Sequence, residues 1–257
     1  MSALQISDLV VRYGHREVVS GVSLDVPAGR TLGLVGESGS GKSTVANAVV
    51  GLAAVHSGEI RVHGTSALGR GAAARAARRR LQLVFQDPFS ALDPRMSVGD
   101  SIAEGLIASP RSFTRAERRV RVAEVLRQVE LDPARADELP RAFSGGQRQR
   151  ITIARALASD PDILIADEVT SALDVSVQGS ILNLLRDLQQ RLDLSILFIS
   201  HNLAVVRYIS DEICVMRAGR IVEAGPTEQL LSNPAAAYTR ELLEAVPVLG
   251  RRMEFSE

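Results

Sequence analysis

The sequence predicts an α/β fold with a mostly parallel central sheet that is interrupted by a helical insertion. In the second half of the chain, short apolar stretches typical of buried strands alternate with amphipathic stretches of helical periodicity. Between about residues 88 and 159, the periodicity is helical throughout. Because apolar strands bounded by helices are typical of parallel sheets covered on both faces, we expect an α/β core built from two separate parts of the chain.

The composition narrows the class of protein. The 257 residues are 46% hydrophobic and 23% charged, as in an ordinary globular protein, and the formal net charge is zero. A balanced charge argues against a nucleic-acid binder that relies on a broad positive field. The single cysteine, Cys214, excludes an internal disulfide framework and lies in an apolar run, so we expect it in the core. We also expect no signal peptide and no membrane span, because no apolar run approaches about 18 residues.

The first part of the chain reads as strands joined by turns. Apolar residues alternate with polar ones up to Val35, and turn residues occur at Gly14 and at Pro27–Gly29. A helix is expected from Ser43 to Gly51, and further strands at Gly58–Val62 and Leu81–Gln86. The arginine-rich stretches 70–80 and 111–121 are interpreted as the solvated faces of a linker and of a helix, respectively.

The second part alternates helices and strands. The predicted elements are helices at 115–129 and 147–158, a strand at 163–166, a helix at 175–191, a strand at 195–199, a helix at 203–208 and a strand at 212–216. The tail from Pro226 is predicted to be helical and to fray at Gly250–Arg252.

A glycine-rich loop follows the strand that ends at Val35. Residues Gly36-Glu37-Ser38-Gly39-Ser40-Gly41-Lys42-Ser43-Thr44 match the phosphate-loop pattern, in which backbone N–H groups and the next helix N-terminus surround a phosphate. Of the thirty cationic residues, only Lys42 is a lysine, and a compact ammonium is suited to reach between two phosphates. The Ser43 hydroxyl is placed to coordinate Mg²⁺.

Two carboxylates, Asp167 and Glu168, follow the apolar strand 163–166. In parallel sheets, ligands bind beyond the carboxyl ends of the strands. Asp167 is suited to hold a magnesium ion, and Glu168 to orient or deprotonate an attacking water.

A second anion-binding helix start occurs at Ser144-Gly145-Gly146-Gln147, where Ser144 is a good N-cap. One nucleotide site does not need two such cradles in a single chain. These residues match the signature of the ATPase subunits of ATP-binding-cassette (ABC) systems, which this chain strongly resembles over nearly its whole length. The resemblance implies a phosphate-loop NTPase fold with an N-terminal antiparallel β subdomain.

The same resemblance assigns roles to further residues. It implies that the Tyr13 ring lies against adenine, that Gln86 touches magnesium and water and links the core to the insertion, and that His201 holds the γ-phosphate. Residues Ser171–Asp174 match the loop that crosses to the partner subunit. The family's mechanism then places two MgATP between two head-to-tail subunits, each bound by one phosphate loop and the opposing signature.

A narrower likeness points to a transport system. Residues 86–98, together with Val175–Gln178 and segments of the tail (219–226, 233–234 and 238–243), resemble the ATPase subunits of bacterial oligopeptide, dipeptide and nickel importers. Val169 departs from that pattern, which usually has proline after the catalytic glutamate. The chain also shows no cysteine-rich C-terminal extension, which shifts the expectation slightly toward nickel or metal-chelate import, or toward the shorter partner of a heterodimeric pair.

The importer likeness implies the partners and the location. We expect two membrane-spanning permease subunits, a second ATPase subunit (a copy of this chain or a paralogue), an extracytoplasmic solute-binding protein that acts through the permease, and a peripheral position on the cytoplasmic face of the membrane. Residues 1–86 and 160–230 would form the ATP-binding core, 87–159 the helical subdomain that receives the membrane subunit, and 231–257 a C-terminal helical tail.

Two alternatives remain open. A soluble ABC ATPase of another process usually has tandem cassettes or a long coiled-coil insertion, and this sequence has neither. A regulatory subunit that binds nucleotide without turnover would require a damaged Glu168 or His201, and both residues are present.

Overall fold

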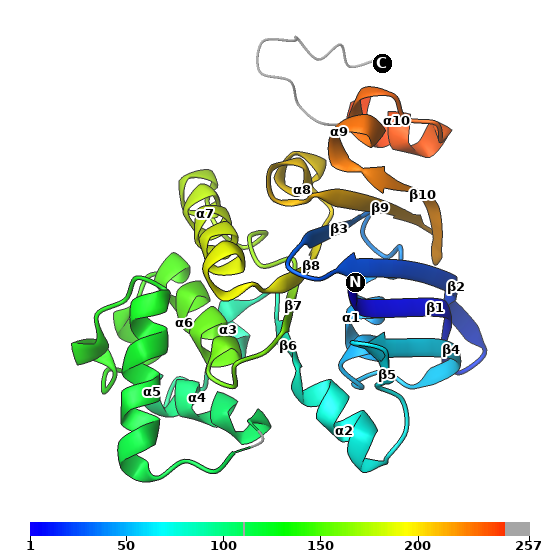
Figure 1. The fold of residues 1–257 in the computed structure, drawn as a ribbon. Helices are drawn as coiled ribbons and strands as arrows, with labels where there is room; N and C mark the ends of the chain where they lie inside the picture. The colour runs from blue at the N-terminus through cyan, green and yellow to red at the C-terminus, as the bar shows by residue number, and fades with distance from the viewer. Residues whose placement is uncertain (110, 245–257) are drawn as a thin grey trace.

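A six-stranded sheet forms the centre of the molecule (Figure 1). The computed structural model describes residues 1–109 and 111–244. The strand order is β10 (Arg220–Pro226), β9 (Glu212–Arg217), β3 (Thr31–Val35), β8 (Ser195–Ser200), β7 (Ile163–Asp167) and β6 (Leu81–Val84). Five of these strands are parallel, and β10 joins the edge antiparallel to β9. The predicted α/β class with a mostly parallel sheet is confirmed.

Both faces of the middle of this sheet are buried, because its inner strands β3, β8 and β7 are apolar over most of their length. In β7, Ile163 and Ile165 join one hydrophobic cluster, while Leu164 and Ala166 join the other. The first cluster packs against α1 (Lys42–Val49) and the N-terminal strands, and the second against α6 (Gly145–Leu157), α7 (Val175–Leu192) and α8 (Leu203–Ile209). Continuous apolar strands are what a sheet covered on both faces requires.

The N-terminal strands form a second, antiparallel sheet. Its order is β2 (Arg16–Pro27), β1 (Ser2–Tyr13), β4 (Val55–Val62) and β5 (Thr65–Ser66). Buried residues alternate with exposed ones along β2, as expected for a sheet with one face on the core. The expected antiparallel β subdomain is confirmed.

Short helices occupy the segment between β6 and β7, and Figure 1 shows them grouped on one side of the central sheet. They are α3 (Pro88–Ala91), α4 (Val98–Gly105), α5 (Arg115–Gln128) and α6, with 3₁₀ turns at Leu106–Ala108, Pro133–Arg135 and Pro140–Ala142. Thr114 and Glu117 form a capping box that fixes the start of α5.

Two elements differ from the prediction. The stretch expected to be a linker contains α2 (Ala72–Arg79), whose buried residues are only Ala74 and Ala77, between arginines that were interpreted as a solvated linker. The strand β10 was not predicted, because its outer face is exposed and its hairpin turn is Ala218-Gly219 rather than a typical Asn-Gly pair. Both turn residues have positive φ, as a tight hairpin requires.

The C-terminal part of the described chain folds as α9 (Thr227–Ser232) and α10 (Ala237–Glu244). The predicted fraying at Gly250–Arg252 lies outside the described residues. In the part of the chain that the structure describes, no helix combines the length and the apolar character needed to cross a membrane. Cys214 is buried in β9, as predicted, and burial raises its pKa to about 12.

Candidate nucleotide-binding site

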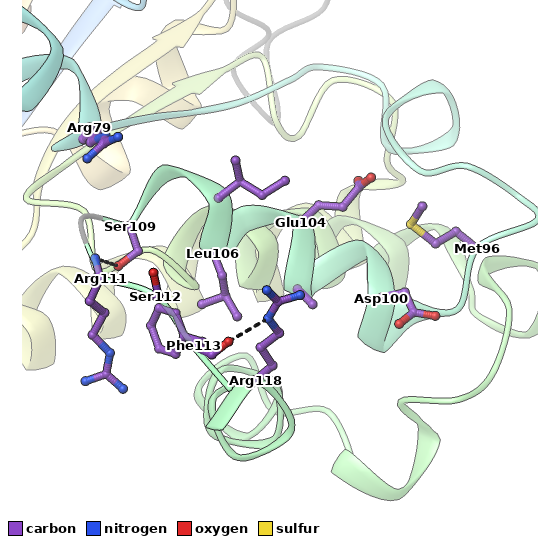
Figure 2. A pocket seen from close by; sticks show the side chains of 12 residues that line it. Arg79, Met96, Asp100, Glu104, Leu106, Ser109, Arg111, Ser112, Phe113 and Arg118 are labelled. Atoms are coloured by element: carbon purple, nitrogen blue, oxygen red, sulfur yellow. Dashed lines mark hydrogen bonds between the residues drawn. The ribbon is translucent and has the colours of Figure 1, made fainter. Parts of the chain in front are cut away.

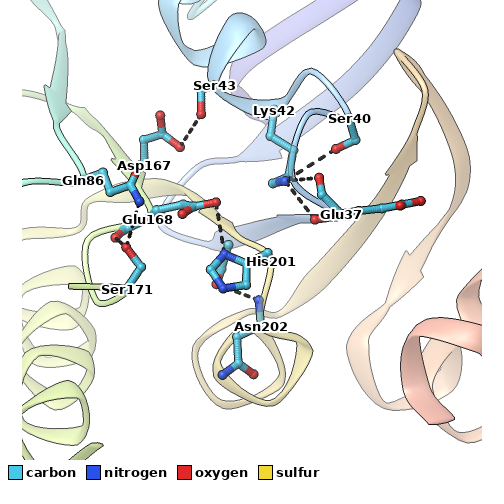
Figure 3. A network of polar contacts seen from close by, with 12 residues as sticks. Glu37, Ser40, Lys42, Ser43, Gln86, Asp167, Glu168, Ser171, His201 and Asn202 are labelled. Atoms are coloured by element: carbon cyan, nitrogen blue, oxygen red, sulfur yellow. Dashed lines mark hydrogen bonds and ion pairs between the residues drawn. The ribbon is translucent and has the colours of Figure 1, made fainter. Parts of the chain in front are cut away.

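The predicted site residues other than Tyr13 and the signature meet at one edge of the central sheet, because they follow strands that run in the same direction. The phosphate loop follows β3, Gln86 follows β6, Asp167 and Glu168 end β7, and His201 follows β8. Parallel strands place their carboxyl ends on the same edge, which is where such sheets bind ligands. Figure 3 shows these side chains facing one another across that edge.

Lys42 lies folded across its own loop. Its Nζ donates hydrogen bonds to the carbonyl oxygens of Gly36 and Glu37, both at 2.8 Å, and contacts the Ser40 hydroxyl at 3.4 Å (Figure 3). The residue is 4% exposed. Burial lowers the pKa of Lys42, while the negative charges of Glu168, Asp167 and Glu37 act in the opposite direction. The loop therefore keeps a desolvated ammonium in place with backbone carbonyls as its partners.

Glycine is required at two positions of the loop. A Cβ on Gly36 would lie 2.0 Å from the Met216 carbonyl oxygen of β9. At Gly41, φ is 108°, and a Cβ would lie 2.9 Å from the Val18 carbonyl oxygen of β2. Both glycines let the loop pass closely between the two sheets.

The first turn of α1 faces the carboxylates. Its N-cap is Gly41, which has no side chain to accept from the N–H groups of that turn, so these donors and the positive end of the helix dipole are suited to an anion. Ser43 Oγ donates to Asp167 Oδ1 at 3.2 Å. Burial raises the pKa of Asp167, and the Ser43 hydrogen bond and the Lys42 charge oppose that rise.

Glu168, the residue after β7, has a strained backbone conformation. Its φ of 49° lies in the left-handed region, which costs a non-glycine residue of order 1 kcal/mol or more. Its N–H donates to the Ile199 carbonyl at 2.9 Å, and its Oε1 lies 3.2 Å from His201 Nδ1. The Glu168 side chain is 14% exposed and that of His201 is 52% exposed. The backbone thus holds a shielded carboxylate against a solvent-facing imidazole.

Gln86 is connected to Glu168 through the Ser171 hydroxyl. Gln86 Nε2 donates to Ser171 Oγ at 3.2 Å, and this hydroxyl donates to the Glu168 carbonyl at 2.9 Å. The amide oxygen of Gln86 is thereby directed by a residue of the predicted crossing loop, a contact that the sequence did not indicate. Val169, at the position expected to be proline, is buried in the core.

The signature residues lie apart from this group. Ser144 caps α6: its hydroxyl accepts from the Gln147 N–H at 3.3 Å, and the Gln147 side chain accepts from the Ser144 N–H at 3.0 Å. A Cβ on Gly146 would lie 2.4 Å from Val177 Cγ1, so this glycine lets α6 pack closely on α7. Figure 1 shows α6 with the other helices of the insertion, away from α1.

Tyr13 is 54% exposed at the end of β1, next to the β1–β2 turn. Its neighbouring strand β2 touches the phosphate loop at Val18. The ring is therefore exposed at the end of a strand whose neighbour reaches the phosphate loop.

A separate cavity of about 510 Å³ lies on the helical insertion (Figure 2). It runs along α4 and the segment that leads to α5, and Arg79 of α2 closes one end. Its lining includes Met96, Glu104, Ile107, Phe113 and Arg118 and no residue of the phosphate loop. The cavity combines apolar side chains with charges of both signs.

Comparison with known proteins agrees with this geometry. The family model described as ABC transporter matches residues 19–171, which include the phosphate loop, Gln86, the signature and both carboxylates. The chain is 53% identical over 256 residues to a putative peptide import ATP-binding protein of Brucella abortus, covering 95% of this chain and 76% of that protein. It is 47% identical to the oligopeptide transport ATP-binding protein OppF of Bacillus subtilis, covering 93% and 79%.

A solved structure shares the fold. The ATP-binding cassette MJ0796, described as a dimer in a post-hydrolysis state bound to ADP and phosphate, has a TM-score of 0.75 and 27% identity, and covers 87% of this chain and 98% of its own. His201 and the C-terminal helices lie beyond the residues that the family model matches, whereas the two relatives cover 95% and 93% of this chain. The edge that gathers Lys42, Asp167 and the Glu168–His201 pair agrees with these matches, which show that the chain belongs to the ABC transporter family and is an ATP-binding, ATP-hydrolysing subunit.

Proposed function

We propose that this chain is the ATPase subunit of a bacterial peptide importer, working as a head-to-tail dimer on two membrane-spanning permease subunits at the cytoplasmic face of the membrane. The observation that carries the proposal is the meeting of Lys42, the Ser43–Asp167 pair and the Glu168–His201 pair at one sheet edge. The peptide assignment is supported by the relatives, whose names give peptide import and oligopeptide transport.

Lys42 binds the phosphates from the position in which its own loop holds it. In the structure its ammonium is held by two carbonyl oxygens. Phosphate oxygens carry full charge and form stronger hydrogen bonds to an ammonium than carbonyls do. ATP therefore takes the third N–H of the Lys42 ammonium, which has only the long contact to Ser40, while the two carbonyls keep the ammonium in place, and the N–H groups at the start of α1 complete the cradle.

The oxygens beside the loop fit a magnesium ion. Mg²⁺ prefers oxygen ligands and usually takes one or two carboxylates together with substrate phosphates. Ser43, Asp167 and the Gln86 amide oxygen supply that chemistry, and burial of Asp167 favours a nearby cation. When bound, the ion would neutralise charge on the phosphate oxygens.

Glu168 and His201 act on the attacking water. Glu168 orients a water molecule and accepts its proton as the water oxygen attacks the γ-phosphorus and the bond to the ADP oxygen breaks. His201 contacts Glu168 at 3.2 Å and is exposed, so it can hold the γ-phosphate and report its presence to the carboxylate.

The second half of each site comes from a facing subunit. Ser144 to Gln147 form an exposed to half-buried helix start in the insertion, and a second copy or a paralogue would bring its own signature to this phosphate loop. Ser171–Asp174 would cross to that partner. Residues 1–86 with 160–230, 87–159 and 231–257 remain our proposed division into core, helical subdomain and tail.

The helical insertion receives the permease. The segment 89–96 and the cavity that Met96 lines are suited to a short helix with an apolar face and charged ends. Gln86 would act as the hinge between the two subdomains. An extracytoplasmic solute-binding protein would act through the permease. The alternative expectation of nickel import has no support in the names of the two relatives above.

The test uses proteoliposomes that contain this chain, its membrane subunits and its solute-binding protein. We expect peptide uptake coupled to phosphate release, and uptake of a nickel chelate in place of peptide would contradict the peptide assignment. Glu168→Gln should keep ATP affinity within about twofold and reduce turnover by about 10²–10⁴-fold, the usual contribution of a general base. Normal turnover in Glu168→Gln would remove Glu168 from its proposed role.

A further inference from the structure

The phosphate loop has a partner that the site described above does not use. Tyr238, in the first turn of α10, places its hydroxyl oxygen 3.1 Å from the Glu37 backbone nitrogen and accepts a hydrogen bond from that N–H. The two residues are 201 positions apart in the chain. Tyr238 is 6% exposed, so the contact is part of the packed structure.

This contact and the Lys42 contact lie on opposite sides of one peptide group. The N–H of Glu37 and the carbonyl of Gly36 belong to the same planar unit and point in opposite directions. Tyr238 holds the N–H, while Lys42 Nζ donates to the carbonyl oxygen at 2.8 Å. A rotation of this peptide plane would break both contacts together. The hydrogen bond from the Glu37 N–H to Tyr238 thus fixes the orientation of the Gly36 carbonyl that accepts from Lys42.

The Glu37 N–H is also turned away from the phosphate position. It faces α10, whereas the carbonyl of the same peptide faces the ammonium inside the loop. A phosphate bound next to Lys42 therefore leaves this N–H with Tyr238 as its acceptor. The hydrogen bond persists with the loop empty or filled, so its effect is to preorganise the loop rather than to compete with ATP.

Residues of two strands, β9 and β10, fix Tyr238 and the segment just before it. The Arg217 guanidinium of β9 stacks on its ring at 4.6 Å. The Glu223 carboxylate of β10 accepts from the N–H groups of Ala235 and Ala236, at 2.8 and 3.1 Å, just before α10 begins. Burial raises the pKa of Tyr238, against the lowering effect of the bond from the Glu37 backbone, so the hydroxyl stays neutral beside the phosphates. The C-terminal segment is therefore fixed to the sheet edge that leads into the phosphate loop.

We propose that Tyr238 is a positioning residue for the phosphate loop, through which residues 227–244 set the affinity of the site for ATP. The proposal rests on the proposed role of Lys42 in phosphate binding. It assigns to the C-terminal helices, which lie outside the matched family region, a direct effect on nucleotide binding.

The main test is Tyr238→Phe, which keeps the ring, its burial and its stacking on Arg217 and removes only the hydroxyl. We expect the Kd for ATP, measured by titration with a fluorescent ATP analogue and by competition with ATP, to rise about three- to tenfold, because without the hydroxyl the empty loop can rotate the Gly36–Glu37 peptide away from the binding orientation and ATP must restore that orientation. At saturating ATP, kcat should change by less than about twofold. Tyr208→Phe is the matched control, since Tyr208 also uses its hydroxyl, on Asn183, but at the exposed side of α8.

A double-mutant cycle with Lys42→Ala shows whether the effect passes through Lys42. If Tyr238 acts by holding the peptide that holds Lys42, Tyr238→Phe should cause little further loss of affinity in the Lys42→Ala background. An additive loss overturns the route through Lys42. Wild-type affinity in Tyr238→Phe, or equal losses in affinity, kcat and thermal stability, overturns the positioning role.

The cycle also distinguishes the proposed role of Lys42 in phosphate binding from the proposed positioning role of Tyr238. If Lys42→Ala binds ATP as tightly as the wild type, the role of Lys42 in phosphate binding is wrong. If Lys42→Ala binds weakly while Tyr238→Phe binds normally, only the role of Tyr238 is wrong.

Discussion

The two helix N-termini suited to anions, those of α1 and α6, are built in opposite ways. At α1, the N-cap is glycine, so the first-turn donors lack a side-chain acceptor, and a buried lysine lies beside them. At α6, Ser144 and Gln147 satisfy each other in a capping box, and Ser144 is exposed. One helix start is incomplete without an anion, and the other is stable without one.

The difference indicates how one ATP can be shared by two chains. An uncapped helix start with a buried cation gains most from a ligand that arrives inside the same chain. A self-capped start can stay on the surface and retain its shape until a partner brings a nucleotide to it. Substitutions at three positions test this contrast, from the largest expected effect to the smallest.

Lys42→Ala should have the largest effect. It removes the only charged donor inside the loop, and hydrogen bonds to charged groups contribute about 1.5–3 kcal/mol, so ATP affinity should fall about ten- to hundredfold. Isothermal titration of the purified chain measures this. Unchanged affinity would mean that the first-turn amides of α1 bind the phosphates without Lys42.

Ser144→Asp separates the capping of α6 by residue 144 from its proposed contact with the nucleotide of the partner subunit. Aspartate caps a helix as well as serine does, so thermal stability should be kept, but its negative charge would face the partner's phosphates. We expect turnover to fall at least about tenfold while ATP affinity of the isolated chain stays unchanged. Ser144→Ala is the companion variant and should cost about 1 kcal/mol of stability through loss of the cap. Full turnover in Ser144→Asp would show that this helix start does not meet nucleotide.

Asp167→Asn should have the smallest effect, on stability. Because burial raises the pKa of Asp167 in the folded chain, the native state binds the proton more tightly than the unfolded chain does. The wild type therefore loses stability as pH rises from the ordinary pKa of 3.8 through the raised value, and the loss is complete above it. In metal-free buffer at pH 7, Asp167→Asn should melt about 1–3 °C higher.

The same measurement at lower pH gives the control. The gain in melting temperature should disappear below about pH 3.8, where both states of the wild type are protonated. A gain that is independent of pH would show that packing, rather than the charge of Asp167, is responsible.

Elements with strong local signals were predictable from the sequence. The strand–loop–helix around Lys42, the apolar strand before Asp167 and the N-cap at Ser144 each follow from a pattern within about ten residues. Residues after parallel strands could also be expected at one edge, because strand direction decides which ends meet. The helix α2 and the strand β10 were missed, since α2 buries only two alanines among its arginines and β10 exposes its outer face.

What the sequence determined by itself is the chemistry: a lone lysine among glycines, two carboxylates after a buried strand, and a serine cap before two glycines. What only the tertiary structure decided is which backbone groups those side chains meet. The Glu168–His201 contact joins residues 33 positions apart, and the Tyr238–Glu37 hydrogen bond joins residues 201 positions apart. The positive φ of Glu168 is likewise held by the structure around it. Such contacts depend on the packing of the whole sheet edge, and no local pattern encodes packing between distant segments.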